Sequence, residues 1–264
     1  MLLAIDIGNT NVTLGVFEGD VIKADWRLRS SRHASKDEVG MSLMGLFQHA
    51  GLTPSDLEGV CLASVVPPLT GTYVQACEQY LRKSPLVVEA GVKTGVKILV
   101  AEPKSVGADR IVNVCAIKSI VSKPAIVVDF GTATTFDAVD GEGNYLGGAI
   151  APGLELAADS LSGRTAKLPR VELVVPPNAI GKTTIDAIRS GVLYGYVSLV
   201  EGMIQRIGDE LLRNSQAQSV SSDLTVVATG GLAPTMAGLT DSIDFVKPNL
   251  TLDGMRLIWN LNRA

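Results

Sequence analysis

An acidic residue stands near the end of an apolar run at the start of the chain, directly before a polar turn. The run reaches Asp6, and Gly8, Asn9 and Thr10 follow before apolar residues resume. A glycine lets the backbone approach a ligand closely, and turn N–H groups with amide and hydroxyl side chains can bind phosphate oxygens. A carboxylate beside them can hold a magnesium ion, largely through water. A plain Asx-type turn explains a single copy about as often.

The same pattern occurs a second time, 123 residues later. Asp129 matches Asp6, and Gly131 matches Gly8 at the same offset. A third turn, Thr229-Gly230-Gly231, follows another buried run. Two phosphate-facing hairpins and a backbone surface for adenosine together favour nucleotide binding. A repeat of this length indicates two related lobes, because solenoid repeats are only about 20–50 residues long.

Two other glycine-containing stretches do not fit the nucleotide-binding motifs that they suggest. Gly181-Lys182-Thr183 lacks the glycine that a P-loop needs five positions before Gly181, where Pro176 stands. The stretch GEGNYL, residues 141–146, lacks the final glycine of a dinucleotide fingerprint. Neither motif is predicted here.

The composition is that of a globular protein with enough apolar residues for full cores. The 264 residues are 46% hydrophobic and 19% charged, with a net charge of −4, which fits one large domain or two lobes of about 100–150 residues. No lysine and arginine cluster indicates nucleic-acid binding, and no apolar run or leader pattern indicates a membrane or secretion. Three widely spaced cysteines and two histidines favour neither disulfides nor a zinc site. A cytoplasmic protein is expected.

The elements that must position the polar turns alternate between strands and helices. Helices are expected over 36–49, 69–82, 107–121 and 185–211, and further buried strands over 59–66 and 224–234. This alternation without long linkers predicts an α/β fold. Gly191, Gly195 and Gly202 should weaken the long helix unless another backbone packs close to them. They indicate tight helix packing, either within the chain or across a subunit interface.

Six motifs occur in an order that is specific to one enzyme family. They are Asp-x-Gly-Asn-Thr from Asp6, VGADRIVN (Val106–Asn113), DFGTATTFD (Asp129–Asp137), GGAIAPGL (Gly147–Leu154), IGKTT (Ile180–Thr184) and ATGGLA (Ala228–Ala233). From Met1 to about residue 260, the chain closely resembles the type III pantothenate kinases of the acetate and sugar kinase, Hsc70 and actin superfamily.

The resemblance implies both a fold and a reaction. The fold would be two ribonuclease H-like lobes, residues 1–118 and 119–264, each a mixed β-sheet flanked by helices, with ATP in the cleft between them. The reaction would be phosphorylation of the primary hydroxyl of pantothenate, the first step of coenzyme A biosynthesis. The family also implies a homodimer, magnesium, and a monovalent cation, either potassium or ammonium.

Site residues follow from the resemblance, position by position. The first phosphate-binding segment would be Asp6, Ile7, Gly8, Asn9, Thr10, Asn11, Val12 and Thr13, and Thr132 would also contact ATP. Asp129 resembles the ligand of the monovalent cation. The pantothenate contacts would be Val100, Gly107, Ala108, Asp109, Arg110 and Thr184, with Asp109 as the proton acceptor.

The chemistry expected of these residues can be weighed against simpler roles. Asp109 lies at a helix start, where free N–H groups favour its ionised form and make it a weaker base, which a loose transition state tolerates. It could instead only cap the helix. Arg110 can hold a carboxylate with two parallel bonds, and is the candidate partner of the pantothenate carboxylate. Thr184 could simply cap the long helix that begins near Ile185.

One position departs from the family, and two other functions stay open. Val100 stands where the family usually carries an aromatic residue that helps to wall the pantothenate pocket. The first alternative function is a catalytically idle regulatory relative, which would be expected to lose Asp109 or the first turn. The second is a kinase of another small alcohol, such as a sugar, although sugar kinases are usually longer.

Overall fold

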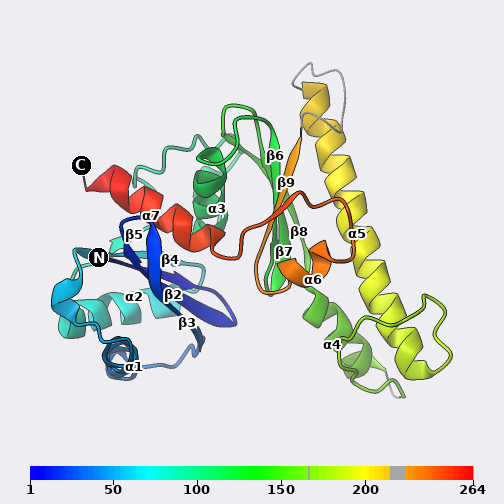
Figure 1. The fold of residues 1–264 in the computed structure, drawn as a ribbon, viewed down its shortest axis with the longest axis horizontal. Helices are drawn as coiled ribbons and strands as arrows, with labels where there is room; N and C mark the ends of the chain where they lie inside the picture. Colours follow the sequence, from blue (N-terminus) through cyan, green and yellow to red (C-terminus); the bar gives the residue numbers. More distant parts are fainter. Residues whose placement is uncertain (166, 215–223, 264) are drawn as a thin grey trace. The chain divides into compact units, whose positions relative to one another are not determined.

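The computed structural model describes residues 1–165, 167–214 and 224–263, which form two compact units (Figure 1). Unit 1 contains Met1–Lys97, Ala101–Ile120 and Leu250–Ala264, and unit 2 contains Ile98–Val100 and Val121–Asn249. Each unit has one five-stranded sheet with helices packed on it, and each is described by itself.

Unit 1 is built on a mixed sheet with the strand order β3-β2-β1-β4-β5. The strands are β1 (Leu2–Ile7), β2 (Asn11–Glu18), β3 (Val21–Arg29), β4 (Gly59–Ser64) and β5 (Leu86–Val87). Strands β1, β2 and β3 are antiparallel neighbours, whereas β4 and β5 run parallel to β1. Strand β1 is central, which explains why its residues are almost all apolar.

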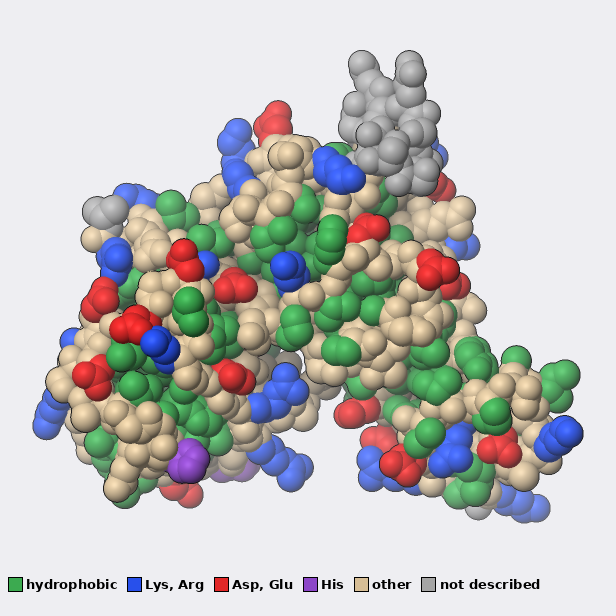
Figure 2. All heavy atoms as spheres, viewed as in Figure 1, with side chains coloured by type: hydrophobic (Ala, Val, Ile, Leu, Met, Phe, Trp, Pro, Cys, Tyr) green, Lys and Arg blue, Asp and Glu red, His purple; other side chains and the backbone are tan. Residues whose placement is uncertain are grey.

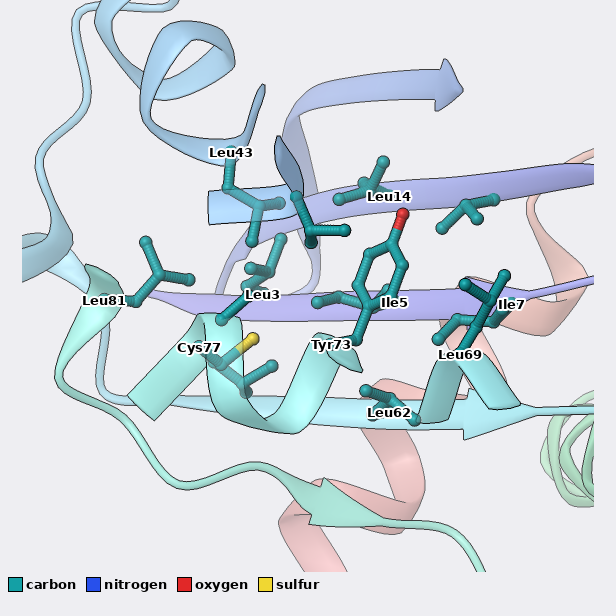
Figure 3. Packing of buried hydrophobic residues seen from close by; sticks show 14 of the residues in the cluster. Leu3, Ile5, Ile7, Leu14, Leu43, Leu62, Leu69, Tyr73, Cys77 and Leu81 are labelled. Carbon is teal, nitrogen blue, oxygen red and sulfur yellow. The ribbon is translucent and has the colours of Figure 1, made fainter. Parts of the chain in front are cut away.

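Helices cover both faces of this sheet. They are α1 (Lys36–His49), α2 (Pro67–Ala76), continued by a π-helical turn (Cys77–Leu81), α3 (Ala108–Lys118) and α7 (Leu250–Asn262), with 3₁₀ turns at Pro54–Asp56 and Pro103–Ser105. Residues Leu3, Ile5 and Ile7 of β1 pack against α1 and α2, where their side chains meet Leu43, Leu69 and Tyr73 (Figure 3). On the other face, Leu2 and Ala4 share a core with residues of α3 and α7. Alternation along β1 therefore points Asp6 toward the face that α3 and α7 cover.

Unit 2 repeats this sheet. Its strands are β6 (Ala125–Phe130), β7 (Ala133–Val139), β8 (Tyr145–Pro152), β9 (Thr225–Thr229) and β10 (Phe245–Val246), in the order β10-β9-β6-β7-β8. Strands β6, β7 and β8 are antiparallel neighbours, and β9 and β10 run parallel to β6. Strands β1 and β6 have the same burial pattern, with one half-buried residue, the aspartate, before a buried last residue. The predicted duplication and α/β fold are confirmed.

One face of the second sheet is covered by α5. The helices of this unit are α4 (Leu154–Arg164), α5 (Thr184–Asn214) and α6 (Ala233–Ala237). Ile126, Val128 and Phe130 of β6 share a core with Ile188, Val192, Leu193, Tyr196, Val197, Val200 and Ile204 of α5. Alternation along β6 therefore points Asp129 toward the face opposite α5.

The boundaries of the units differ from the predicted lobes, 1–118 and 119–264. Helix α7 belongs to unit 1, because Leu252, Met255 and Ile258 pack in the core that contains Leu2 and Ala4. The segment 98–100 belongs to unit 2, because the Leu99 N–H donates to the Tyr145 carbonyl at the start of β8. The local sequence does not indicate that α7 belongs to unit 1 or that residues 98–100 belong to unit 2.

The glycines of α5 are not packed against another part of the described chain. A Cβ atom added to Gly191 or Gly195 would meet nothing within 4 Å, and one added to Gly202 would meet only the side chain of Arg206. Tight packing of these glycines within the chain is therefore a wrong prediction, and packing across a subunit interface stays a prediction.

The surface and helix lengths add two observations. Figure 2 shows acidic and basic side chains interspersed over the visible face, in agreement with the mixed charges of the sequence. In the described part of the chain, no helix combines the length and the apolar character needed to cross a membrane.

Candidate active site

The first polar turn joins β1 to β2 through residues 8–10, and Ile7 is paired opposite Val12. The Gly8 N–H donates to the Asn11 carbonyl at 2.9 Å. A Cβ on Gly8 would lie 3.0 Å from that carbonyl oxygen, so the tightness of the turn favours glycine there. Asn9, Thr10 and Asn11 are exposed, whereas Ile7 and Val12 are fully buried. The part of this turn that a ligand can reach is therefore Asn9, Thr10 and Asn11, whereas Ile7 and Val12 have no exposed surface.

Strand β3 leads into a segment that holds the first turn. The Ser30 hydroxyl donates to the Gly8 carbonyl at 2.5 Å, and the Ser30 N–H donates to the Thr10 carbonyl at 2.9 Å. The Arg32 side chain reaches Asn9, with Nη2 at 3.5 Å from Oδ1. These contacts could not be predicted from the sequence, because a serine after a strand has no defined role until the strand order is known.

The start of α3 lies close to the first turn within unit 1. The Val65 N–H, just after β4, donates to the Ile7 carbonyl at 3.0 Å. A Cβ on Gly107, the N-cap of α3, would lie 3.4 Å from Cγ1 of the same Val65. The end of β1, which leads into the first turn, and Gly107 at the start of α3 therefore both lie beside Val65, at the carboxyl ends of the parallel strands β1 and β4, where open α/β sheets bind ligands. Asp6 and α3 lie on the same face of this sheet.

Asp109 is held within the first turn of α3. Its Oδ1 atom accepts a hydrogen bond from the Arg110 N–H at 2.8 Å. Burial raises the pKa of this carboxyl above its ordinary value, and the backbone hydrogen bond and the charge of Arg110 oppose the rise without cancelling it. The expectation that the helix start leaves Asp109 a weakened base is therefore wrong in its net direction. A carboxylate that is harder to keep ionised is a better proton acceptor.

The second polar turn, in unit 2, has the same form but is one residue shorter. Residues 131–132 join β6 to β7, and the Gly131 N–H donates to the Ala133 carbonyl at 3.2 Å. Thr132 is exposed, and its carbonyl accepts a hydrogen bond from the Gly153 N–H at 3.2 Å. A Cβ on Gly153, the N-cap of α4, would lie 2.3 Å from the same carbonyl oxygen, so the start of α4 packs closely against the backbone of this turn.

Asp129 lies beside a turn from the neighbouring parallel strand, β9. Gly230 has a φ of +89°, which favours glycine, and a Cβ there would lie 2.6 Å from Oδ1 of Asp129. The predicted third turn, Thr229-Gly230-Gly231, therefore packs against the acid of the second copy. In unit 2, as in unit 1, a half-buried aspartate and its turn stand at the carboxyl ends of parallel strands.

Two further predicted residues lie in unit 2. Val100 is half-buried, and its Cγ1 is 3.5 Å from the position of a Cβ on Gly147 in β8. Thr184 is the first residue of α5 and lines an apolar groove on α4 and α5. Thr183, not Thr184, caps the helix, because its Oγ1 accepts from the Asp186 N–H at 3.1 Å. The suggestion that Thr184 acts as the cap is wrong.

The aspartate beside the first polar turn is suited to a magnesium ion that is bound together with a nucleotide. Among the residues that the structure describes, no group of three or more Asp, Glu, His or Cys side chains could hold a metal ion by itself. Magnesium bound with a nucleotide keeps several waters and needs only one or two carboxylates besides the phosphates. Asp6, half-buried beside the first polar turn, satisfies that requirement by itself.

Comparison with known proteins decides the family. A model of the type III pantothenate kinase family matches residues 2–206. The chain belongs to the type III pantothenate kinase family. Among its relatives, the type III pantothenate kinase of Moorella thermoacetica is 48% identical over 99% of this chain and 100% of its own length. That of Anaeromyxobacter dehalogenans strain 2CP-C is 47% identical over the full length of both.

Solved structures support the fold of this family member. A Campylobacter jejuni protein assigned to the Baf family of transcriptional activators has a TM-score of 0.63 at 20% identity, covering 99% of this chain and 98% of its own. A Sinorhizobium meliloti protein assigned as a 2-dehydro-3-deoxygalactonokinase has a TM-score of 0.55 at 12% identity, covering 99% and 97%. At such identities the likeness shows only the fold, two ribonuclease H-like lobes with sheets of the same strand order.

Proposed function

We propose that this chain phosphorylates the primary hydroxyl of pantothenate with ATP, giving 4'-phosphopantothenate in the first step of coenzyme A biosynthesis. The supporting observation lies within unit 1. A turn suited to phosphate, a half-buried Asp6 and the start of α3 with Asp109 gather at the carboxyl ends of β1 and β4. The full-length identity to type III pantothenate kinases supplies the substrate. Neither alternative function has comparable support.

In the proposed reaction, Asp109 accepts the proton of the pantothenate hydroxyl. A bond forms between that oxygen and the γ-phosphorus of ATP, the bond from the γ-phosphorus to the bridging oxygen breaks, and ADP leaves with its electron pair. The transition state is loose, so the protein contributes mainly position and charge. The burial that raises the pKa of Asp109 makes its carboxylate a stronger base for this transfer.

The two polar turns have the roles that their backbone suggests. In unit 1, the turn after Asp6, including Asn9, Thr10 and Asn11, would bind phosphate oxygens, and the side chain of Thr13 is half-buried on β2. In unit 2, Thr132 would contact ATP. Asp6 would hold magnesium, and Asp129 a potassium or ammonium ion. Such cations offset the negative charge of the phosphates.

Pantothenate recognition is proposed for the segment at the start of α3 and for two residues of unit 2. Gly107 and Ala108 would offer backbone, and Arg110, which is half-buried, would pair with the pantothenate carboxylate. Val100 would form part of the pocket wall, and Thr184 would contribute its hydroxyl.

Association of two copies is part of the proposal. The groove on α4 and α5 has a volume of about 720 Å³ and is lined mainly by apolar side chains, with Gly191 and Gly195 open toward it. Leu156 and Leu199, which also line it, are exposed in the single chain. A homodimer would cover them, in keeping with the glycines that have no neighbour within the chain. A cytoplasmic location stays a prediction.

Substitution of Asp109 tests the proposed reaction. Asp109→Asn keeps the shape of the side chain and removes the base, so kcat for pantothenate-dependent ADP release should fall roughly 10²–10⁴-fold. Asp140→Asn is the matched control, because Asp140 accepts hydrogen bonds from Glu142 and Asn144 in the β7–β8 hairpin of unit 2. That control should keep kcat within about twofold of the wild type. Unchanged turnover in Asp109→Asn would refute the assignment of the base, and no ADP release with pantothenate in the wild type would refute the function.

A further inference from the structure

Helix α7 packs along α3, the helix that begins with Asp109 (Figure 1). The two helices approach closely where Gly254 of α7 faces Val112 of α3. A Cβ on Gly254 would lie 2.1 Å from the Val112 carbonyl oxygen, a distance that no side chain tolerates. The glycine therefore allows the backbone of α7 to lie against the backbone of α3.

A hydrogen bond fixes the register of the two helices at the same place. The Thr251 Oγ1 of α7 donates to Oδ1 of Asn113 at 2.8 Å, and Asn113 is only 1% exposed. Asn113 is the final residue of the VGADRIVN motif, and the proposed reaction gives it no role. It follows Asp109 by four residues, so the two side chains lie on the same face of α3.

Helix α7 is itself anchored at several points of unit 1. Arg256 forms an ion pair with Asp20 and lies over the ring of Phe17. At the end of the helix, Asn262 accepts from the Lys93 N–H at 3.1 Å and donates to the Lys93 carbonyl at 2.8 Å. Arg256 lies within one turn of Gly254 and holds the part of α7 that faces α3, whereas Asn262 holds only the C-terminal end of the helix, eight residues beyond Gly254.

We propose that α7 is the positioning element for the helix that carries the proposed base, with Thr251 and Gly254 as positioning residues that act through Asn113 and Val112. This inference rests on the proposed function, because it gives Asp109 the role of proton acceptor. A displacement of about 1 Å in a reacting group can cost up to 10²-fold in rate. A shift of α3 along α7 therefore changes turnover more than it changes the binding of ATP, whose phosphate-binding turn in unit 1 lies between β1 and β2.

The test compares three variants of the full-length chain. Thr251→Val removes the donor and keeps the shape, Thr251→Ser keeps the hydroxyl, and Asn262→Ala removes hydrogen bonds from the same helix at its contact with Lys93. We expect Thr251→Val to lower kcat about tenfold with the KM for ATP within about twofold of the wild type. Thr251→Ser should restore kcat to within about twofold, and Asn262→Ala should lower the melting temperature without lowering kcat.

Each outcome has one meaning. If kcat of Thr251→Val stays within about twofold of the wild type while Asp109→Asn is inactive, the positioning proposal is wrong and the proposed base stands. If Thr251→Ser is as slow as Thr251→Val, or Asn262→Ala is equally slow, the effect is general loss of structure and the positioning proposal is again wrong. If Asp109→Asn is fully active, the proposed function fails, whatever Thr251 does.

Discussion

The hydroxyl of Ser30 offers a measurable test of how the first turn is held. It donates to the Gly8 carbonyl at 2.5 Å, while the backbone N–H of the same residue donates to the Thr10 carbonyl at 2.9 Å. Ser30→Ala removes the first of these bonds and keeps the second. The turn then loses one hydrogen bond from this segment, and no ligand-contacting side chain changes.

The expected size follows from the energy of one hydrogen bond. A neutral hydrogen bond contributes about 1 kcal/mol net to the arrangement that it holds. If the free turn loses about 1 kcal/mol, the population in the binding arrangement falls by up to about fivefold, and the apparent affinity for ATP falls by the same factor. We therefore expect the KM for ATP to rise up to about fivefold. The value of kcat should stay unchanged, because bound ATP restores the turn.

Ser35→Ala provides the matched control in a coupled assay of ADP release at varied ATP. Ser35 caps α1 by accepting from the Glu38 N–H at 3.3 Å, and its removal costs about 1 kcal/mol of stability without touching the turn. Ser30→Thr keeps the hydroxyl and should keep the wild-type KM. An unchanged KM in Ser30→Ala, or an equal rise in Ser35→Ala, would show that Ser30 does not hold the turn for ATP.

Three further predictions concern the charge and shape of the site. Because burial raises the pKa of Asp109 in the folded chain, its contribution to stability is present below the ordinary aspartate pKa, about 3.9, and is lost as the pH rises through the raised value. Urea unfolding should therefore show Asp109→Asn gaining stability relative to the wild type between acidic and neutral pH, and a constant difference would contradict the burial. Val100→Tyr should lower the KM for pantothenate, since Gly147 leaves room beside Val100 for a ring, and an unchanged KM would mean that residue 100 does not wall the pocket. Replacing potassium or ammonium with sodium should abolish most activity, and full activity in sodium would remove the case for Asp129 as a selective cation ligand.

Local patterns were sufficient for much of the fold. The offset between Asp6 and Asp129 predicted the duplication, because a strand, an acid and a glycine turn are read from neighbouring residues. Helix α1 begins where Ser35 and Glu38 form a capping box, a signal contained in four residues. A similar signal, Thr183 with Asp186, was available for α5 and would have assigned the cap to Thr183.

The remainder depends on contacts between distant segments. From its neighbours in sequence, Gly254 predicts only a local loss of helix stability. In the structure α7 continues through Gly254, and a glycine is needed there because the Val112 backbone leaves no space for a side chain. The sign of the shift in the pKa of Asp109 likewise depends on burial, which a helix start does not reveal. Ser30 had no recognisable role before the order of β1, β2 and β3 was known.

The division of unit 1 into separated segments has a consequence during synthesis. A ribosome synthesises the chain from its N-terminus to its C-terminus, so all of unit 2, up to Asn249, is made before α7. Until α7 has been made, the apolar face of β1 that contains Leu2 and Ala4 is not covered by this helix. A message cut short at that point yields a product with an uncovered core, which chaperones and proteases treat as unfolded. Unit 1, which carries the proposed base, is therefore complete only after α7 has been synthesised.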